Sequence, residues 1–323
     1  MSHAIDPALP PPLPRDGRGT VITVGTFDGV HRGHHEVLEE IVRRARRTDR
    51  RSALVTFEPH PLQVVRPEAA PPLLTTLEEK KPLLAASGLD YAVFLPFTPV
   101  LQRYPARRFV EEILLGRLGM QELVMGYDHG FGRGREGSVE TLRELGAELH
   151  FGVDVVEAVE RGGEPVSSTR IRHALAEGDV VAAARGLGRP YSLQGPVVHG
   201  SHRGREIGFP TANIAIADAH KLLPLEGIYA VHGWVGADRL PGLLHLGPRP
   251  TFPGEPPSVE LHLLDFSGDL YGQELRVDFC ARLRGVEAYD TVEALVAQMR
   301  ADAALGRAVL RGEAGPSACA ALR

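Results

Sequence analysis

Histidines and glycines gather in one short segment near the start of the chain. His31 and His34 are three residues apart, Gly29 and Gly33 accompany them, and an apolar run that ends at Gly25 comes directly before. The run predicts a buried strand and the residues after it a helix, whose first N–H groups attract anions. Glycines let the backbone approach a ligand closely, and two histidines on one turn can face the same phosphate. The segment is typical of a site for attack on a phosphoryl centre, where positioning and charge stabilisation dominate.

A second cluster, from Ser167 to Arg172, combines hydroxyls with arginines at the predicted start of another helix. Helix capping explains one hydroxyl, but Arg170 and Arg172 stand at a helix end whose dipole prefers negative charge. A bound phosphate would resolve that conflict. The alternative for the first segment is that His31 and His34 are ordinary surface residues in a chain with 14 histidines. The strand, the glycines and the helix start around them favour the phosphate site.

A glycine-rich segment contains the GxGxxG spacing at Gly132, Gly134 and Gly137. A dinucleotide-binding fingerprint follows its strand at once, whereas here six residues separate Met125 from the first of these glycines. The spacing therefore does not favour the cofactor loop of a Rossmann dehydrogenase, and no Walker A lysine pattern occurs in the chain. We interpret the segment as a mobile substrate loop in which Asp128 makes a polar contact.

The second half of the chain has its own phosphate-binding composition. Glycines and arginines between Gly195 and Asn213 suit a loop that wraps phosphates. Thr211 and Asn213 are two residues apart, so on a strand they face the same side, and their oxygens suit Mg²⁺ that is held by ATP. The alternative is a turn followed by a barrel strand with one polar face.

Glu260 lies on a predicted strand in which polar and apolar residues alternate. A half-buried strand with a solvent-facing side shows the same alternation. A glutamate in the mouth of a barrel can instead accept a proton from a substrate hydroxyl. The spacing alone leaves both interpretations open.

These candidate sites fall in two halves with different secondary-structure patterns. In the first half strands alternate with helices, which indicates an α/β domain with a parallel sheet and crossover helices. From Tyr191 onward six strands joined by Gly- and Pro-rich turns indicate a small closed antiparallel β-barrel, followed by a helix at about residues 291–310. The predicted strands of the first half are 20–25, 52–57, 91–95 and 122–125, with helices at 33–48, 77–87, 106–118, 169–177 and 180–186. The predicted barrel strands are 193–199, 211–216, 228–235, 240–246, 258–264 and 275–283.

The composition is that of a soluble globular protein, with 323 residues of which 43% are hydrophobic and 24% charged. That length allows two domains. The net charge of −5 gives no basic excess for nucleic acid or an anionic membrane, and no run approaches the roughly 20 apolar residues that span a bilayer. The Pro-rich first residues do not resemble a secretory signal. Cys280 and Cys319 are too few for a disulfide framework or a cysteine-based zinc site, so we expect a reducing cytoplasm.

Four segments of the first half, in this order, resemble the FAD synthetase module of bacterial bifunctional riboflavin kinase/FAD synthetases. They are GTFDGVHRGH from Gly25, FEPHP from Phe57, GYDHGFGRGREG from Gly126 and SSTRIR from Ser167. The resemblance implies a Rossmann-like nucleotidyltransferase domain that transfers AMP from ATP to FMN and releases pyrophosphate, with His31 and His34 stabilising the ATP phosphates. It places ATP or phosphate contacts at Gly25, Phe27, Asp28, Gly29, Ser168, Thr169 and Arg172, and nucleotide or flavin contacts at Pro59, Pro61 and Asp128. His129 and Gly130 depart from the residues common in the family.

The second half is similar to the riboflavin kinase module of the same family. The matching segments are GREIGFPTANI, GIYAV, GPRPTF and VELHLLDF. The similarity implies phosphorylation of the riboflavin 5′-hydroxyl by MgATP in the six-stranded barrel, with Glu260 as the catalytic base. It places the ATP phosphates and Mg²⁺ at Gly204, Arg205, Gly208, Thr211 and Asn213, of which Thr211 and Asn213 are the metal ligands. His245 departs from an asparagine common in the family, and the segment that ends at Tyr289 follows the family pattern only loosely.

The similarity covers residues 20–310 and implies the organisation of the chain. We expect a flexible Pro-rich leader (1–19), an FAD synthetase domain (20–187), a riboflavin kinase domain (188–312) and a loose tail (313–323). The expected substrates are riboflavin, FMN and ATP with Mg²⁺, and FMN and FAD are the products. No nucleic-acid or membrane partner is expected, and the sequence does not indicate an oligomeric state.

Two other interpretations remain open. The first domain of such a kinase could have lost adenylyl transfer or accept another substrate, since HxGH domains also serve cytidylyl and pantetheine-phosphate adenylyl transfer. The fused barrel argues against this, because those enzymes do not need one. A flavin-binding regulator without turnover would not need His31, His34, Thr211 and Glu260, all of which are present.

Overall fold

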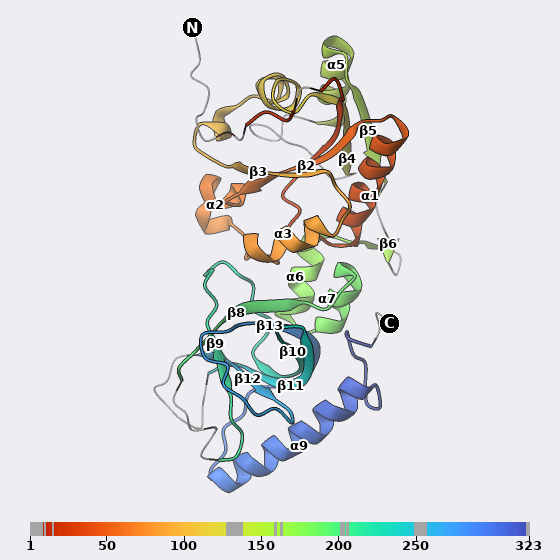
Figure 1. Cartoon of the computed structure of the whole chain (residues 1–323). Coiled ribbons are helices and arrows are strands. Elements are labelled where there is room, and N and C mark those ends of the chain that lie inside the picture. The colour runs from red at the N-terminus through yellow and green to blue at the C-terminus, as the bar shows by residue number, and fades with distance from the viewer. Residues whose placement is uncertain are drawn as a thin grey trace. The chain divides into compact units, whose positions relative to one another are not determined.

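The computed structural model describes residues 9, 11–14, 16–126, 138–157, 160–161, 164–200, 204, 207–248 and 257–320. Contacts within the chain divide it into two compact units, Met1–Val166 and Ser167–Arg323. Figure 1 shows the helices and strands of each. No helix in the described part of the chain is long and apolar enough to cross a membrane.

A parallel sheet of five strands forms the centre of the first unit, in the order β3-β2-β1-β4-β5. The four predicted strands are confirmed, but the edge strand β5 was missed. Its apolar residues alternate with Gly152 and Asp154 and are only half-buried, so its pattern is short and weak. The strands are β1 (Thr20–Val24), β2 (Arg51–Glu58), β3 (Tyr91–Pro96), β4 (Met120–Gly126) and β5 (Gly152–Val156).

Helices cover both faces of this sheet, because successive strand residues point to opposite sides. Ile22 and Leu123 pack with α4, η3 and α5 on one face. Val21, Leu54 and Val124 pack with α1 and α3 on the other. The helical elements are α1 (Arg32–Arg47), α2 (Pro61–Val65), η1 (Pro67–Ala69), α3 (Leu77–Ala85), η2 (Leu101–Arg103), α4 (Ala106–Phe109), η3 (Val110–Leu115) and α5 (Val139–Leu149), and β6 (Glu160–Arg161) pairs with β7 (Glu164–Pro165).

The strand order reverses at β1. The chain runs from β1 outward to β2 and β3, and then returns to the other side of β1 to form β4 and β5. Ligands of open α/β sheets bind at the carboxyl end of the strands, where the strand order reverses. The segment from Gly25 to His31 leaves β1 at that end, so the fold places it where a ligand is expected.

Six strands close an antiparallel barrel in the second unit, in the order β10-β11-β12-β9-β8-β13. All six predicted strands are confirmed, and closure leaves no unpaired sheet edge. The large rings of Tyr229 and Phe279 are fully buried and meet edge to face. The strands are β8 (Ser192–Val198), β9 (Ala212–Ile214), β10 (Gly227–Val235), β11 (Asp238–Gly247), β12 (Ser258–Leu263) and β13 (Glu274–Arg284).

Three helices accompany the barrel: α6 (Ser168–Ala176), α7 (Val180–Leu187) and α9 (Val292–Arg311). Contacts within the chain place α6 and α7 in the same compact unit as the barrel. The predicted domain boundary lies after residue 187 and assigns both helices to the first domain instead. One such contact is the hydrogen bond from Leu225 N–H to the carbonyl oxygen of Leu175 in α6, at 2.9 Å.

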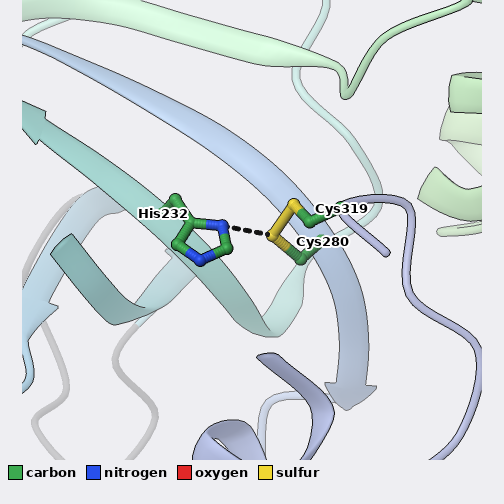
Figure 2. A group of neighbouring side chains, drawn as sticks. All are labelled: His232, Cys280 and Cys319. Atoms are coloured by element: carbon green, nitrogen blue, oxygen red, sulfur yellow. Dashed lines mark hydrogen bonds between the residues drawn. A yellow bond between two sulfur atoms is a disulfide. The ribbon is translucent and has the colours of Figure 1, made fainter. Parts of the chain in front are cut away.

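The segment after α9 is packed, so the expectation of a loose tail is wrong for residues 313–320. Ala318 is fully buried, and its N–H donates to the carbonyl oxygen of Cys280 at 2.7 Å. Cys319 is joined to Cys280 by a disulfide (Figure 2). The tail has no periodic apolar pattern that would have predicted its packing. Ser317 and Ala318 are buried, Ala314 and Cys319 pack against the core beside Cys280, and one backbone hydrogen bond and the disulfide join the tail to β13.

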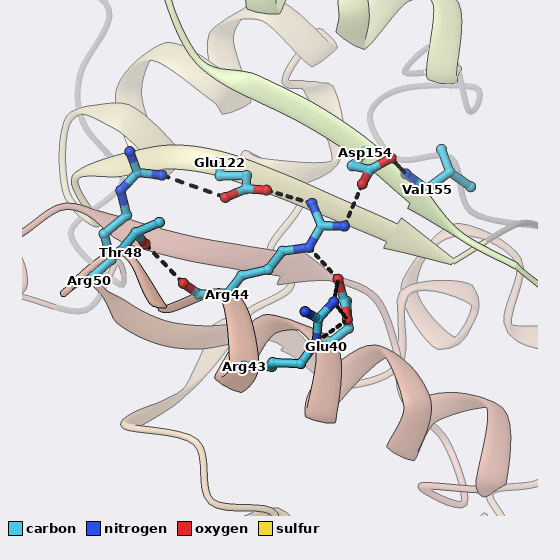
Figure 3. A network of polar contacts seen from close by, with 8 residues as sticks. All are labelled: Glu40, Arg43, Arg44, Thr48, Arg50, Glu122, Asp154 and Val155. Atoms are coloured by element: carbon cyan, nitrogen blue, oxygen red, sulfur yellow. Dashed lines mark hydrogen bonds and ion pairs between the residues drawn. The ribbon is translucent and has the colours of Figure 1, made fainter. Parts of the chain in front are cut away.

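A single arginine joins α1 to the sheet (Figure 3). Arg44 forms ion pairs with Glu40 on its own helix, with Glu122 on β4 at 2.6 Å, and with Asp154 on β5. Burial opposes the charge of Arg44, but the hydrogen bonds that its guanidinium donates to these three carboxylates outweigh burial and raise the pKa of the guanidinium. The hydrogen bond from Arg44 in turn lowers the pKa of Asp154.

We expect Arg44→Met to lower the free energy of unfolding of the first unit by about 2 kcal/mol, between the values for exposed and buried ion pairs. A carboxyl group with a lowered pKa contributes stability above its ordinary pKa, near 4, and the contribution is lost as the pH falls through the lowered value. The difference between wild type and variant should therefore shrink below about pH 4. Urea unfolding at pH 7 and at acid pH measures it. An equal difference at both would contradict the role of Arg44.

Candidate active sites

His31 and His34 cap each other at the start of α1. His31 is the N-cap residue, its Nδ1 accepts the N–H of His34 at 3.3 Å, and the Nδ1 of His34 accepts the N–H of His31 at 3.3 Å. Both rings are buried and stack with their centroids 3.6 Å apart. A ring nitrogen that accepts a hydrogen bond carries no proton, so each neutral ring carries its proton on Nε2. The pair thus has two Nε2–H donors held in one orientation.

The loop between β1 and α1 has an unusual backbone. Phe27 has φ 47° and Val30 has φ 38°, values that side chains with a Cβ rarely adopt, and Gly29 has φ 82° between them. The side chains of Phe27 and Val30 are almost completely buried, and the Phe27 ring stacks on His34 at 4.4 Å. Strained residues held by burial are typical of functional sites.

A segment far away in the sequence, which contains Leu74 and Thr75, holds this loop. The buried carboxylate of Asp28 accepts the N–H groups of Leu74 and Thr75, both at 3.0 Å. The Thr75 hydroxyl oxygen accepts the N–H of Gly29 at 3.1 Å. Asp28, predicted as a phosphate contact, therefore anchors the loop in this structure.

Lys80 also supports the loop, and the sequence did not single it out. Its ammonium group donates to the carbonyl oxygen of Thr26 at 2.9 Å. Burial lowers the pKa of Lys80, while the carboxylates of Asp28 and Glu58 act in the opposite direction. Lys80 and Thr75 lie about fifty residues beyond the loop, so no local spacing could have identified them.

Other predicted residues of this site lie on neighbouring elements. Gly25 follows β1, and its N–H donates to the carbonyl oxygen of Val55 at 3.0 Å. Pro59 follows β2, and Pro61 is the first residue of α2, whose N-cap is His60. Asp128 lies outside the described residues.

The predicted phosphate residues Ser168, Thr169 and Arg172 lie in the first turns of α6, in the second unit. The cap is Ser167, whose hydroxyl oxygen accepts the N–H of Arg170 at 3.4 Å. Capping thus uses one hydroxyl of the cluster, as the sequence predicts. The two hydroxyls that follow belong to the first turn of the helix.

Glu260 is the centre of the second candidate site. Its two carboxylate oxygens accept different hydroxyls: Oε2 accepts Thr211 at 3.1 Å and Oε1 accepts Ser258 at 2.8 Å. The side chain is 16% exposed. Ser258 and Glu260 are half-buried on β12, where they alternate with buried apolar residues. Ser258 was missed as a site residue, although its position two residues before Glu260 on a strand places both on one face.

The antiparallel register brings three polar residues into a row across the barrel. Asn213 on β9 and His245 on β11 are the direct partners of Glu260 on β12. The Nδ1 of His245 lies 3.8 Å from Oε1 of Glu260. The predicted ligands Thr211 and Asn213 therefore lie beside the predicted base Glu260.

Glycines allow the loop before β9 to approach these residues. A Cβ on Gly200 would lie 2.2 Å from the Asn213 amide nitrogen, and one on Gly204 would lie 2.3 Å from the carbonyl oxygen of Phe209. Gly208 has φ 84°. Arg205, the predicted phosphate ligand of this loop, lies outside the described residues.

Comparison with known proteins identifies both halves. A family model described as FAD synthetase matches residues 13–170, and one described as riboflavin kinase matches residues 187–310. A bifunctional riboflavin kinase/FMN adenylyltransferase of Pseudomonas fluorescens is 39% identical over 302 residues, which cover 93% of this chain and 95% of the relative. The chain belongs to this family.

Other members and a solved structure support the same assignment of family and fold. The bifunctional riboflavin kinase/FMN adenylyltransferase of Escherichia coli (strain K12) is 37% identical, over 88% of this chain and 90% of its own length. A solved structure described as a macrolide-efflux protein of Streptococcus pneumoniae has a TM-score of 0.80 and 29% identity, over 90% of this chain and 94% of that one.

In this riboflavin kinase/FMN adenylyltransferase, we expect Lys80→Met to destabilise the first unit by about 1–3 kcal/mol, because the Thr26 carbonyl oxygen loses its donor and Asp28 its nearby positive charge. Chemical denaturation followed by circular dichroism measures the change. Lys81→Met is the matched control, since Lys81 forms an exposed ion pair with Glu78 and its loss should cost less than about 1 kcal/mol. Equal effects of the two variants would contradict a supporting role for Lys80.

Proposed function

We propose that the barrel phosphorylates riboflavin to FMN at Glu260, and that the sheet domain transfers AMP from a second ATP to FMN at His31 and His34, which yields FAD and pyrophosphate. The proposal rests on one observation: each candidate site lies within the residues that one of the two family models matches. The histidine pair lies within residues 13–170 and Glu260 within residues 187–310.

Glu260 is the proposed general base of the kinase step. Thr211 and Ser258 each donate to a different carboxylate oxygen, so the carboxylate is oriented before riboflavin binds. It accepts the proton of the riboflavin 5′-hydroxyl. The hydroxyl oxygen then bonds to the γ-phosphorus of ATP, the bond from that phosphorus to the bridging oxygen breaks, and ADP leaves.

The side chains beside Glu260 fit a magnesium ion. The Thr211 hydroxyl and the Asn213 amide offer oxygen ligands, which Mg²⁺ prefers. Asn213 lies on β9, and Thr211 directly precedes that strand. We assign them as its protein ligands, with the ATP phosphates supplying further oxygens. Bound Mg²⁺ neutralises phosphate charge that would otherwise repel the incoming oxygen.

His31 and His34 are the proposed donors of the adenylyl-transfer step. Their Nδ1 atoms accept backbone N–H groups, so the proton of each neutral ring is on Nε2, and these Nε2–H groups donate to phosphate oxygens of ATP. A phosphate oxygen of FMN bonds to the α-phosphorus while the bond from that phosphorus to pyrophosphate breaks. The FMN phosphate is already ionised near pH 7, so no general base is needed and the two imidazoles act by charge stabilisation.

The remaining contacts are proposed from the family motifs. For adenylyl transfer they are Gly25, Phe27, Asp28 and Gly29 in the β1–α1 loop, Ser168, Thr169 and Arg172 in α6, and Pro59, Pro61 and Asp128 near the nucleotide or flavin. For the kinase step they are Gly204, Arg205 and Gly208. The contribution of Asp28 to nucleotide binding is indirect, because its carboxylate accepts hydrogen bonds from Leu74 and Thr75 and so holds the conformation of the loop.

Two variants test the division of labour. We expect Glu260→Gln to lower FMN formation at least a hundredfold, since the amide cannot accept the proton, and to leave FMN adenylylation within about twofold. We expect His31→Gln to lower adenylylation a hundredfold or more, the typical loss for a stabilising donor, and to leave the kinase unchanged. Chromatography of riboflavin, FMN and FAD over time, with ATP and Mg²⁺, measures both.

Each variant serves as the control for the other. Glu274→Gln, on an exposed position of β13, controls for the removal of a barrel carboxylate and should leave both activities intact. Loss of both activities in one correctly folded variant would contradict two separate sites.

A further inference from the structure

The two cysteines of the chain form one disulfide (Figure 2), and the two residues differ in burial. Cys280 lies on β13 and is fully buried, whereas Cys319 lies in the tail and is partly exposed. They are 39 residues apart in sequence, and their Cα atoms are 5.0 Å apart. Cys319 is therefore the more accessible of the two cysteines for attack by an external thiol, which makes Cys280 the leaving group.

A histidine is placed to stabilise that leaving group. Nδ1 of the buried His232 on β10 lies 3.1 Å from Sγ of Cys280. Nη2 of Arg239 lies 3.2 Å from Nε2 of His232. The same nitrogen lies 3.1 Å from Nδ1, so a guanidinium, which only donates and keeps its charge, lies beside both ring nitrogens and close to the sulfur. A donor and a nearby positive charge lower the pKa of a thiol and make it a better leaving group.

The disulfide is the main attachment of the tail. Ala318 contributes a small side chain, which packs with Val181 and Ala184 of α7, and one backbone hydrogen bond to Cys280. Gly312 and Gly315 have φ of 80° and 62°. Glycine adopts these left-handed conformations without strain, and they turn the chain after α9. The remaining contacts are the buried side chain of Ser317 and the packing of Ala314 beside Cys280. Half of residues 313–320 are exposed, so loss of the covalent bond would leave a small buried area to hold the segment.

The tail also forms one wall of a cavity of about 280 Å³. Ala314 and Pro316 line it from the tail, Val180 from α7, Leu283 from β13 and Val309 from α9. Release of the tail would open this cavity and expose the apolar end of α9.

A bound metal is a weaker explanation for the same three residues. The ligand atoms of His232, Cys280 and Cys319 lie within 4.8 Å of one another. Two of them are already joined by a covalent bond, however, and the Arg239 guanidinium lies 3.1 Å from Nδ1 of His232. That positive charge opposes a divalent cation.

We propose that Cys280, Cys319 and His232 form a thiol–disulfide redox site that switches the tail between an attached and a released state. The thiolate of an external dithiol attacks Sγ of Cys319, the Cys280–Cys319 bond breaks, and its electron pair passes to Sγ of Cys280, which accepts a hydrogen bond or a proton from His232. The second thiol of the reductant resolves the mixed disulfide and releases Cys319. Two protein thiols and one external disulfide result, and a disulfide of the same class reverses the reaction.

Hydrogen exchange on the full-length protein tests the switch. The protein is equilibrated with oxidised or reduced dithiothreitol, its thiols are counted by maleimide mass shift after denaturation, and deuterium uptake is followed for residues 313–320. We expect no thiols and a protected Ala318 amide in the oxidised protein, and two thiols with at least tenfold faster uptake in the reduced protein. Cys319→Ser should exchange rapidly in both buffers, and strand β1 should not change in any sample.

Two results would overturn the proposal. One is the presence of two thiols after incubation with oxidised dithiothreitol. The other is equal protection of the tail in oxidised protein, reduced protein and Cys319→Ser. If Cys319→Ser does not fold, the comparison of wild type in the two buffers decides alone.

A separate measurement tests the role of His232. We expect His232→Asn to slow reduction of the disulfide by dithiothreitol on the order of tenfold at pH 7, because Cys280 becomes a poorer leaving group. His262→Asn, which removes a half-buried histidine of β12 that is remote in sequence from both cysteines, is the matched control. An unchanged reduction rate in His232→Asn would contradict a role for His232 in the proposed site. The hydrogen-exchange experiment would then test the tail switch independently of His232.

Discussion

Burial holds the backbone of Phe27 and Val30 in a left-handed conformation, and the amino-terminal site depends on this constraint. Such a conformation costs about 1–2 kcal/mol for each residue with a Cβ, whereas complete burial of a Phe or Val side chain contributes about 1.5–3 kcal/mol. Burial therefore outweighs the strain. Asp28, between them, adds hydrogen bonds from Leu74 and Thr75. The loop reaches α1 already shaped, so that His31 and His34 need no reorganisation to face a ligand.

The second site depends on strand register in the same way. Asn213, Glu260 and His245 form a row because β9, β12 and β11 pair at these residues. A shift of one residue would turn Glu260 toward the core and Leu261 away from it. Because the barrel is closed, such a shift would also disturb the pairing of the other strands. The position of the carboxylate is thus secured by the whole barrel core.

The two chemistries occupy units that have separate cores. In the first unit the apolar residues of the sheet pack with its own helices on both faces. In the second unit the strand that carries Cys280 packs with the end of α9 and with the tail. A change in the conformation of the tail would therefore affect the packing of the barrel unit first. Arg44 has a comparable role in the first unit, where it links one helix to two strands that are remote in sequence.

The sequence by itself predicted most of the secondary structure and, through its motifs, both chemistries. Hydrophobic periodicity is local, so ten strands and the main helices were predictable, and β5 was missed because Gly152 and Asp154 interrupt its short pattern. Thr75, Lys80 and the disulfide could not be predicted, because their partners lie about 40 to 50 residues away in the sequence. Only the tertiary structure decided that Asp28 anchors a loop and that Glu260 meets Thr211. Both depend on chain segments that become neighbours when the core forms.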